Sequence, residues 1–142
     1  MTEKLLSIAA PQVVNAAAKE TFDFLGSKAF FRLTGADEVA LDFTIGGRFE
    51  LAFERRGGGA IVGRVLEIVR PERIALSWDL RGFGRPDAID TRVLITLAAP
   101  LDDAASGTRV SVLHSGIQSE ESARAKERAC REILAELADR VV

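Results

Sequence analysis

Side chains that carry most enzyme chemistry and cross-linking are scarce in this chain of 142 residues, which has one cysteine, one histidine and no tyrosine. With Cys130 as its single cysteine the chain can form no intramolecular disulfide, which is compatible with the reducing cytoplasm where we expect it. One histidine and one cysteine also fall short of the roughly three or four nitrogen and sulfur ligands of a usual transition-metal site. We therefore predict neither a metal nor another cofactor.

Long apolar runs and an excess of basic charge are missing as well. The apolar stretch Leu5–Ala10 is shorter than the ~7–15 residues of a signal-peptide core, and no stretch approaches the ~20 residues of a membrane span. The formal net charge of −2 argues against nucleic acid as a partner. Hydrophobic residues make up 47% of the chain and charged residues 28%, so we expect one soluble globular domain over residues 1–142.

The N-terminal part of the sequence predicts one strand and two short helices. Leu5–Ala16 is rich in Leu, Val and Ile, but it contains Pro11, so this strand either lies at a sheet edge or begins after the proline. Residues 17–25 favour a helix by composition, and Ser27 is a plausible cap for a second helix over residues 28–33. Two short helices in a row are typical of a connection that crosses the end of a sheet.

Alternation of apolar and polar residues then predicts six further strands joined by hairpins. They cover Val39–Ile45, Arg48–Arg55, Ile61–Val69, Ile74–Leu80, Thr91–Leu97 and Thr108–Ser115. Gly57–Gly59 is read as a hairpin loop, because no Lys-Ser/Thr follows it as in a phosphate-binding loop. Gly63 interrupts its strand and indicates a bulge or a close approach of another backbone.

The C-terminal residues predict one long amphipathic helix. Ser119 provides a hydroxyl cap and is followed by acidic residues near the positive end of the helix dipole. Beyond it, apolar side chains recur at steps of three and four and form one stripe: Cys130, Ile133, Leu134, Leu137 and Val141. A long antiparallel sheet must curve, and its apolar face needs a cover, which this helix supplies. The fold class predicted is α+β, a helix-grip arrangement of about seven strands around the C-terminal helix.

Three local motifs indicate a resemblance to a known family. They are Phe-Thr-Ile-Gly-Gly-Arg-Phe at Phe43–Phe49, Gly-Arg-Val-Leu-Glu-Ile-Val-Arg-Pro-Glu-Arg-Ile at the start of Gly63–Trp78, and Gly-Thr-Arg-Val-Ser-Val-Leu-His-Ser-Gly at the start of Gly107–Ile117. In order and spacing the chain resembles the SRPBCC superfamily (START, Bet v and polyketide-cyclase-like domains), in the branch of bacterial homologues of the heat-shock ATPase activator. The resemblance spans nearly the whole chain and implies the helix-grip fold. It does not specify a function, because that branch is diverse in ligands and activities.

Two departures from that family pattern bear on the space above the sheet. Members usually carry a tryptophan at the end of the second short helix, where this chain has Phe30-Phe31. They usually carry Gly-Trp in the last helix, where this chain has Ala129-Cys130. Loss of an indole at that point is expected to leave more room between helix and sheet, and a relative's ligand cannot be carried over.

The residues expected to line a pocket between the sheet and the last helix are apolar with one exception. They are Phe22, Phe30, Phe49, Leu51, Phe53, Leu76, Trp78, Val112, His114, Cys130 and Leu134. For any single aromatic among them, filling the core is the more common role, and it is their shared concave face that predicts a cavity. The loop at residues 81–87 and the two short helices are expected to form its mouth.

His114 is the one polar residue predicted in that pocket, and two roles stay open for it. It could orient a ligand or act as a general base, or it could be a hydrogen-bonded wall residue that anchors the chain before the last helix. No second histidine, Cys–His spacing or nucleophile elbow supports catalysis, so we assign no catalytic residue. Cys130, on the apolar stripe, is expected to be a buried and inert thiol.

Three functions are compatible with these features. The first is binding or transport of an apolar or amphipathic small molecule, which requires a pocket above ~300 Å³ between sheet and helix. The second is an enzyme of the cyclase, dehydratase or hydrolase type found in the superfamily, which requires polar groups converging in the pocket. The third is a co-chaperone-like interaction module, which requires an exposed apolar or charged match. A homodimer through an edge strand or the last helix stays open.

Overall fold

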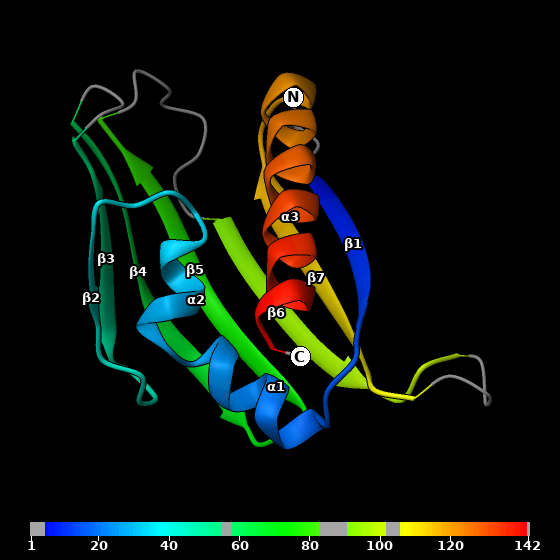
Figure 1. The fold of residues 1–142 in the computed structure, drawn as a ribbon. Helices are drawn as coiled ribbons and strands as arrows, with labels where there is room; N and C mark the ends of the chain where they lie inside the picture. Colours follow the sequence, from blue (N-terminus) through cyan, green and yellow to red (C-terminus); the bar gives the residue numbers. More distant parts are fainter. Residues whose placement is uncertain (1–4, 55–57, 83–90, 102–105, 142) are drawn as a thin grey trace.

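The computed structural model describes residues 5–54, 58–82, 91–101 and 106–141. Its elements are β1 (Leu6–Val14), α1 (Ala18–Leu25), α2 (Lys28–Arg32), β2 (Glu38–Leu41), β3 (Arg48–Phe53), β4 (Gly59–Val69), β5 (Arg73–Arg81), β6 (Thr91–Ala98), β7 (Thr108–Ile117) and α3 (Glu120–Arg140). Figure 1 shows a curved sheet that wraps around the long helix α3, so the predicted α+β helix-grip fold is confirmed.

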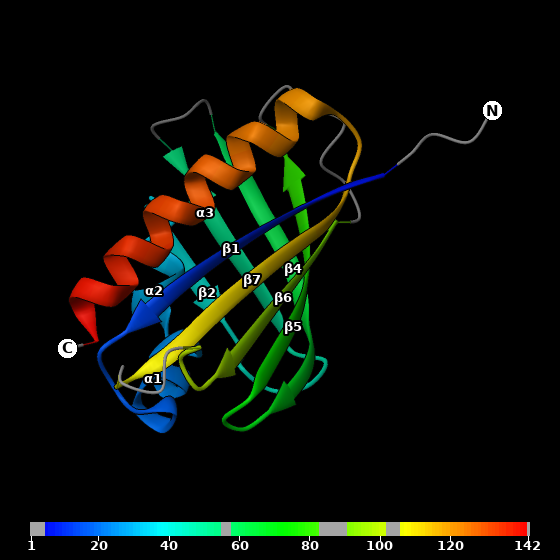
Figure 2. The ribbon, with the colours of Figure 1, turned by 90° about the vertical axis from the view of Figure 1, so that its right-hand side faces the viewer.

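The strands form a single antiparallel sheet in the order β1-β7-β6-β5-β4-β3-β2. All neighbours except β1 and β7 are consecutive in the chain, so most connections in the sheet are hairpins. The sheet bends so that α3 lies along its concave side, beside β1 and β7, while α1 and α2 lie at one end of that side (Figures 1 and 2).

The first strand keeps its proline because it lies at the edge of the sheet. Among the described strands, β1 pairs only with β7, and Pro11 lies within it, opposite Ser111. A strand at an edge leaves part of its N–H groups without a ladder partner, so a residue that lacks the N–H is tolerated there. Of the two alternatives predicted for this strand, the edge position is confirmed.

The prediction of a strand over Val39–Ile45 is wrong in its second half. β2 ends at Leu41, and Ile45, which was expected to face inward, is 68% exposed. Beyond Leu41 the chain turns toward β4, where the Gly46 N–H donates to the Val65 carbonyl at 2.7 Å. Gly46 has a φ of +83°, a backbone conformation that residues with a side chain rarely adopt. The alternation of apolar residues thus extends past the end of β2, through residues that no longer pair with β3.

Of the two roles predicted for Gly63, the close approach is the one observed. A Cβ at this position would lie 2.0 Å from the Ser77 carbonyl oxygen and 2.6 Å from the Phe49 ring. The irregularity in the register of β4 falls further along, between Val65 and Glu67. Gly63 therefore lets β5 and an aromatic ring come closer than any side chain would permit.

Helix α3 begins and packs as its sequence predicts. Ser119 caps it, since its Oγ accepts a hydrogen bond from the Ser122 N–H at 3.1 Å. On the apolar stripe, Leu134 and Leu137 are fully buried in the core cluster, and Cys130 is partly buried against it. Burial of one leucine of this kind is worth about 2–5 kcal/mol against alanine, so these contacts dominate the docking of α3 on the sheet.

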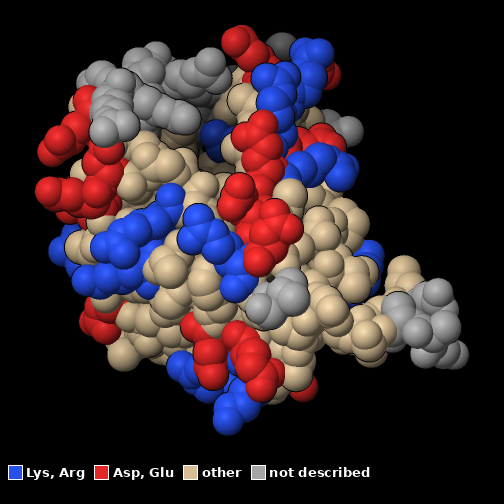
Figure 3. Space-filling view, viewed as in Figure 1, with Lys and Arg blue, Asp and Glu red and all other residues tan. Residues whose placement is uncertain are grey.

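The outward face of α3 carries charges of both signs, visible as alternating red and blue along the helix in Figure 3. Arg131 and Glu127 form an ion pair at 3.1 Å on this face, and both side chains are largely exposed. Exposed pairs of this type contribute about 0–1 kcal/mol each, so this face adds little to stability. Among the described helices, none is both long and apolar enough to cross a membrane.

Candidate functional site

A cavity of about 350 Å³ lies between the concave side of the sheet and α3. Side chains from α2, five of the strands and α3 form its walls: Phe30, Phe31, Thr34, Phe53, Ile61, Leu76, Trp78, Leu80, Val93, Ile95, Val112, His114, Ala125, Lys126, Ala129, Cys130, Ile133 and Leu134. Nearly all of these are aromatic or aliphatic. In the space-filling view the surface is hollowed beside the N-terminal half of α3, with a basic side chain visible inside (Figure 3).

Most of the residues expected to line a pocket lie on this cavity. They are Phe30, Phe53, Leu76, Trp78, Val112, His114, Cys130 and Leu134. The other three do not line it. Phe22, on α1, is 1% exposed and packs beneath the Arg70 guanidinium, 5.2 Å from its ring centroid. Leu51 is fully enclosed in the core, and Phe49 stacks between Phe31 and Trp78 instead of facing the space.

Lys126 was not foreseen at this site, although the sequence held a signal for it. It lies four residues before Cys130, and therefore on the same face of α3 as the apolar stripe. A lysine in line with such a stripe lays its aliphatic stem along the apolar surface that the stripe covers. The strand residues that were missed, such as Ile61, Val93 and Ile95, follow the same alternation as those that were predicted.

The expected mouth of the pocket is described only in part. Part of the loop predicted at residues 81–87 lies outside the described residues, because the structure does not describe residues 83–90. Arg81 lines a different hollow, on the outer face of the sheet. Of the two short helices, α2 lines the cavity through Phe30 and Phe31, whereas no residue of α1 does.

Aromatic rings connect α2 with the far wall of the cavity. Ring centroids lie 5.8 Å apart for Phe30 and Phe31, 5.3 Å for Phe31 and Phe49, and 5.6 Å for Phe49 and Trp78. Trp78 then meets the His114 ring edge-on at 6.3 Å. Such tilted and edge-to-face pairs are the favoured geometry for aromatic groups, and they hold the wall rings in fixed positions around the space.

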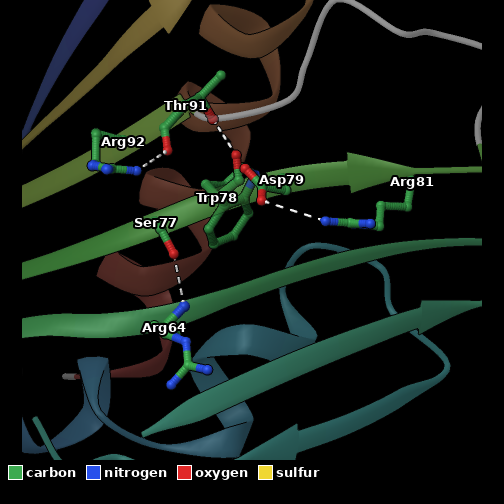
Figure 4. Close-up of polar contacts among 7 residues, drawn as sticks. All are labelled: Arg64, Ser77, Trp78, Asp79, Arg81, Thr91 and Arg92. Carbon is green, nitrogen blue, oxygen red and sulfur yellow. Dashed lines mark hydrogen bonds and ion pairs between the residues drawn. The ribbon is translucent and has the colours of Figure 1, made fainter. Parts of the chain in front are cut away.

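The hydrogen bonds of His114 define which ring nitrogen carries the proton. Thr91 Oγ1 donates its single hydrogen to the Trp78 carbonyl, a contact drawn in Figure 4. The same oxygen lies 2.8 Å from His114 Nε2, and it has no second hydrogen to give. Nε2 must therefore be the protonated nitrogen that donates to Thr91 Oγ1, and Nδ1 of the neutral ring keeps a lone pair.

That lone pair has no partner among the described residues. His114 is 7% exposed, and its one hydrogen bond is the contact with Thr91. Among the described residues, no side-chain nitrogen or oxygen is both shielded from solvent and without a partner. Nδ1 therefore has some accessible surface, on a residue that lines the cavity. The ring is a wall residue, as one of the predicted roles required, and it also offers a hydrogen-bond acceptor to an occupant.

Burial keeps this ring neutral near physiological pH. The pKa of His114 is lowered to about 4, chiefly because its surroundings disfavour the charged form and secondly because of the positive charge of Lys126. Lys126 donates to Ser122 Oγ at 3.1 Å and makes further contacts. It is the one charged side chain among the described residues that line the cavity.

Cys130 was expected to be buried, and the structure places it only partly buried, in apolar surroundings. Its pKa is raised to about 11, mainly by burial, with the Glu127 carboxylate adding to the effect and the Arg131 guanidinium opposing it. A thiol with this pKa is almost wholly protonated at neutral pH. Its role on the cavity wall is packing.

A second hollow, of about 680 Å³, lies on the outer face of the sheet and has a different character. Charged side chains of β3, β4 and β5 line it, among them Arg64, Asp79 and Arg81. Arg81 approaches Asp79 at 3.9 Å, and the Arg64 N–H donates to Ser77 Oγ at 2.8 Å (Figure 4). The walls of this hollow are largely charged and polar, whereas small-molecule sites are typically lined by apolar groups, so the larger volume does not make this hollow the better site. No group of His, Cys, Asp and Glu side chains in the described part of the chain is arranged to hold a metal.

Comparison with known proteins agrees with this architecture. The chain superposes on a protein from Chromobacterium violaceum with a TM-score of 0.78 and 26% identity, over 95% of this chain and 96% of that one. It superposes on the Aha1 dimer from Colwellia psychrerythraea with 0.73 and 14%, over 96% of both chains. For an Hsp90 activator from Plasmodium falciparum the values are 0.68 and 19%, over 92% of both chains.

No relative was found among curated proteins. A family description does match, however, and it covers residues 15–141, which is most of the sequence and includes every wall of the cavity. The chain therefore belongs to the family of activator of Hsp90 ATPase homolog 1-like proteins.

Proposed function

We propose that this protein binds or carries an apolar or amphipathic small molecule in the cavity between the sheet and α3. The observation that supports this is the cavity itself, which has about 350 Å³ of space and walls made of aromatic and aliphatic side chains. Protein interiors are ordinarily packed without voids much larger than a water molecule. A concave apolar space of at least ~300 Å³ with a few polar groups is typical of small-molecule sites.

Binding is better supported than catalysis. Among the described residues that line the cavity there is no carboxylate, and the hydroxyl of Thr34 donates to the Phe31 carbonyl at 2.7 Å. With its lowered pKa, His114 is a weak base, and the hydroxyl beside it among the described residues, that of Thr91, donates its hydrogen to the Trp78 carbonyl and not to the ring. Two alternative functions stay open: an enzyme of the cyclase, dehydratase or hydrolase type, and a co-chaperone-like module. A homodimer and a cytoplasmic location stay predictions.

A neutral fluorescent probe tests the proposal directly. N-phenyl-1-naphthylamine is nearly dark in water and becomes bright in a dry apolar site, so titration of the protein with this probe reports occupancy. The expected result is a saturable increase with one probe bound per chain. Native mass spectrometry of the purified protein, before and after organic extraction, then asks whether a natural ligand is carried.

Two tryptophan variants show where the probe binds. Cys130→Trp places an indole from α3 into the cavity and is expected to weaken probe binding about tenfold or more, whereas Ala135→Trp adds the same group on the exposed side of the same helix. Thermal melts of both variants check that the fold persists. Probe binding that does not saturate, or that survives Cys130→Trp in a folded protein, would refute the proposal.

A further inference from the structure

Two nitrogen atoms on the wall of the cavity have no hydrogen-bond partner among the described residues. One is Nδ1 of His114, whose ring uses its other nitrogen to donate to Thr91 Oγ1. The other is Nε1 of Trp78, an indole N–H whose ring contacts are with Phe49 and His114. No side-chain nitrogen or oxygen in the described part of the chain is both shielded from solvent and unpartnered, so each of these two nitrogens has accessible surface, on a residue that lines the cavity.

The other nitrogen and oxygen atoms of the described wall side chains are already engaged. The Thr34 hydroxyl donates to the Phe31 carbonyl at 2.7 Å. The Lys126 ammonium donates to Ser122 Oγ at 3.1 Å and has a further interaction. Nearly all remaining side chains of the described wall are hydrocarbon or aromatic. A polar group of an occupant therefore finds its side-chain partners at the two unpartnered nitrogens, because burial of an unpaired polar atom elsewhere would cost about 1–3 kcal/mol or more.

Thr91 holds the two rings in place. It lies on β6, between the strands that carry Trp78 and His114, and it is wholly buried. Its hydroxyl donates to the Trp78 carbonyl, as Figure 4 shows, and accepts from His114 Nε2 at 2.8 Å. The rings of Trp78 and His114 meet edge-on, with centroids 6.3 Å apart. The head group of one small ligand can therefore touch both rings at once.

The two nitrogens have opposite hydrogen-bonding character. Nδ1 of the neutral imidazole only accepts, and the indole N–H only donates. A carboxylate offers only acceptors, so it suits the indole and not the imidazole, and an ammonium group offers only donors and suits the imidazole alone. Either charge would also be costly to bury among these apolar walls. A neutral group with one donor and one acceptor suits both nitrogens.

We propose that the ligand of this cavity is a neutral apolar molecule with a hydrogen-bond donor and an acceptor a few atoms apart, as in a carboxamide, a lactam or a hydroxy-ketone. Its donor binds Nδ1 of His114, and its acceptor binds the Nε1–H group of Trp78. This inference rests on the proposed function and names the ligand class for that same site. The aromatic rings of the wall favour a flat body behind the head group, and the volume of about 350 Å³ has room for two fused rings.

The neutral state of the histidine supports this assignment. Burial, and secondly the charge of Lys126, lower the pKa of His114 to about 4. Nδ1 therefore remains an acceptor throughout the neutral range and does not compete with the indole as a donor.

Nitrogen-15 NMR of the labelled protein reads both contacts directly, because the chain has one histidine and one tryptophan. Three naphthalenes of similar size are first shown to displace N-phenyl-1-naphthylamine. 2-Naphthamide has a donor and an acceptor, methyl 2-naphthoate has acceptors alone, and 2-ethylnaphthalene has neither. Relative to the 2-ethylnaphthalene complex, we expect 2-naphthamide to shift the resonances of both Nδ1 and the indole N–H in the direction of hydrogen bonding. Methyl 2-naphthoate should shift the indole resonance alone.

Two variants of the wall assign the indole contact by affinity. Trp78→Phe keeps an aromatic ring but removes the N–H, and it is expected to lower the affinity of 2-naphthamide relative to 2-ethylnaphthalene about fivefold. Phe30→Leu removes a ring from the wall but no polar atom, so it is expected to weaken both compounds alike and leave their ratio unchanged. Thermal melts check that each variant folds, and the NMR comparison uses the unaltered chain.

The outcomes separate this inference from the proposed function. If the naphthalenes displace the probe but either nitrogen has the same resonance with 2-naphthamide as with 2-ethylnaphthalene, the paired contact is overturned and the apolar cavity site stands. The same holds if a folded Trp78→Phe variant leaves the affinity ratio intact. If neither the probe nor any naphthalene binds, the proposed function fails and this inference fails with it.

Discussion

The stability of the fold should depend on pH through its single histidine, and the dependence can be worked out from the site. His114 is neutral in the folded chain down to a pKa of about 4, compared with an ordinary value of 6.5 when the chain is unfolded. Between these two values the unfolded chain binds more protons than the folded chain. Lowering the pH through this window therefore destabilises the fold, and above about pH 6.5 the imidazole adds no slope.

The size of the effect follows from the gap between the two pKa values. Each pH unit is worth about 1.36 kcal/mol, so the descent from pH 6.5 to pH 4 removes about 3 kcal/mol from the free energy of unfolding. That is a large part of the about 5–15 kcal/mol that stabilises a typical domain. His114→Gln keeps an amide N–H that can reach Thr91 but does not titrate, so it should lack this slope.

Urea denaturation of both proteins from about pH 7 to about pH 4.5 measures the difference directly, because carboxylates shared by the two proteins cancel. The NMR titration of the lone imidazole gives the pKa itself without assignment, since the chain has one histidine. Parallel stability curves for the two proteins, or a titration midpoint near 6.5, would refute the argument. A ring whose Nδ1 is found protonated would contradict the hydrogen bonds from which the tautomer was deduced.

Three further predictions concern single positions. Cys130, with its pKa raised to about 11, should react with a disulfide reagent at about pH 8 roughly 100-fold more slowly than a free thiol, and a ligand in the cavity should slow it further. Gly63→Ala should destabilise the fold by about 1–3 kcal/mol in urea denaturation, because its Cβ would overlap the Ser77 carbonyl oxygen. Gly58→Ala meets no neighbouring atom and should cost only the strain of its φ of +79°, about 1 kcal/mol. Ser119→Ala should cost about 1 kcal/mol through loss of the α3 cap, with Ser119→Asp restoring it.

The elements of the fold could be predicted because their signals are local. The hydroxyl cap at Ser119 and the apolar stripe of α3 depend on residues a few positions apart, and the structure has both. Gly63 indicated a bulge or a close approach from the sequence alone, and only the structure shows that it is a close approach and that Ser77 and Phe49 are the neighbours. Apolar alternation misled at Ile45, because nothing in that pattern records where hydrogen bonding to the next strand stops.

The candidate site was predictable only in part, because alternation gives the face of a residue but not its depth. Leu51 and Phe53 share the inward face of β3, yet only Phe53 reaches the cavity, while Leu51 is closed off by its neighbours. Lys126 was missed because only apolar residues were counted on the stripe of α3. Its position depends on how far α3 lies above the sheet, which is a property of packing between distant segments.

The pairing of β1 with β7 has a consequence for the order in which the protein can assemble during synthesis. Within the described sheet, β1 precedes the other strands in the chain but pairs with β7 at residues 108–117, and α3 follows directly after β7. Until those residues have been synthesised, β1 lacks this partner and the concave side of the sheet lacks the cover that α3 provides. The cavity is thus closed only when α3 docks, and a hydrophobic compound present at that moment could be enclosed by it.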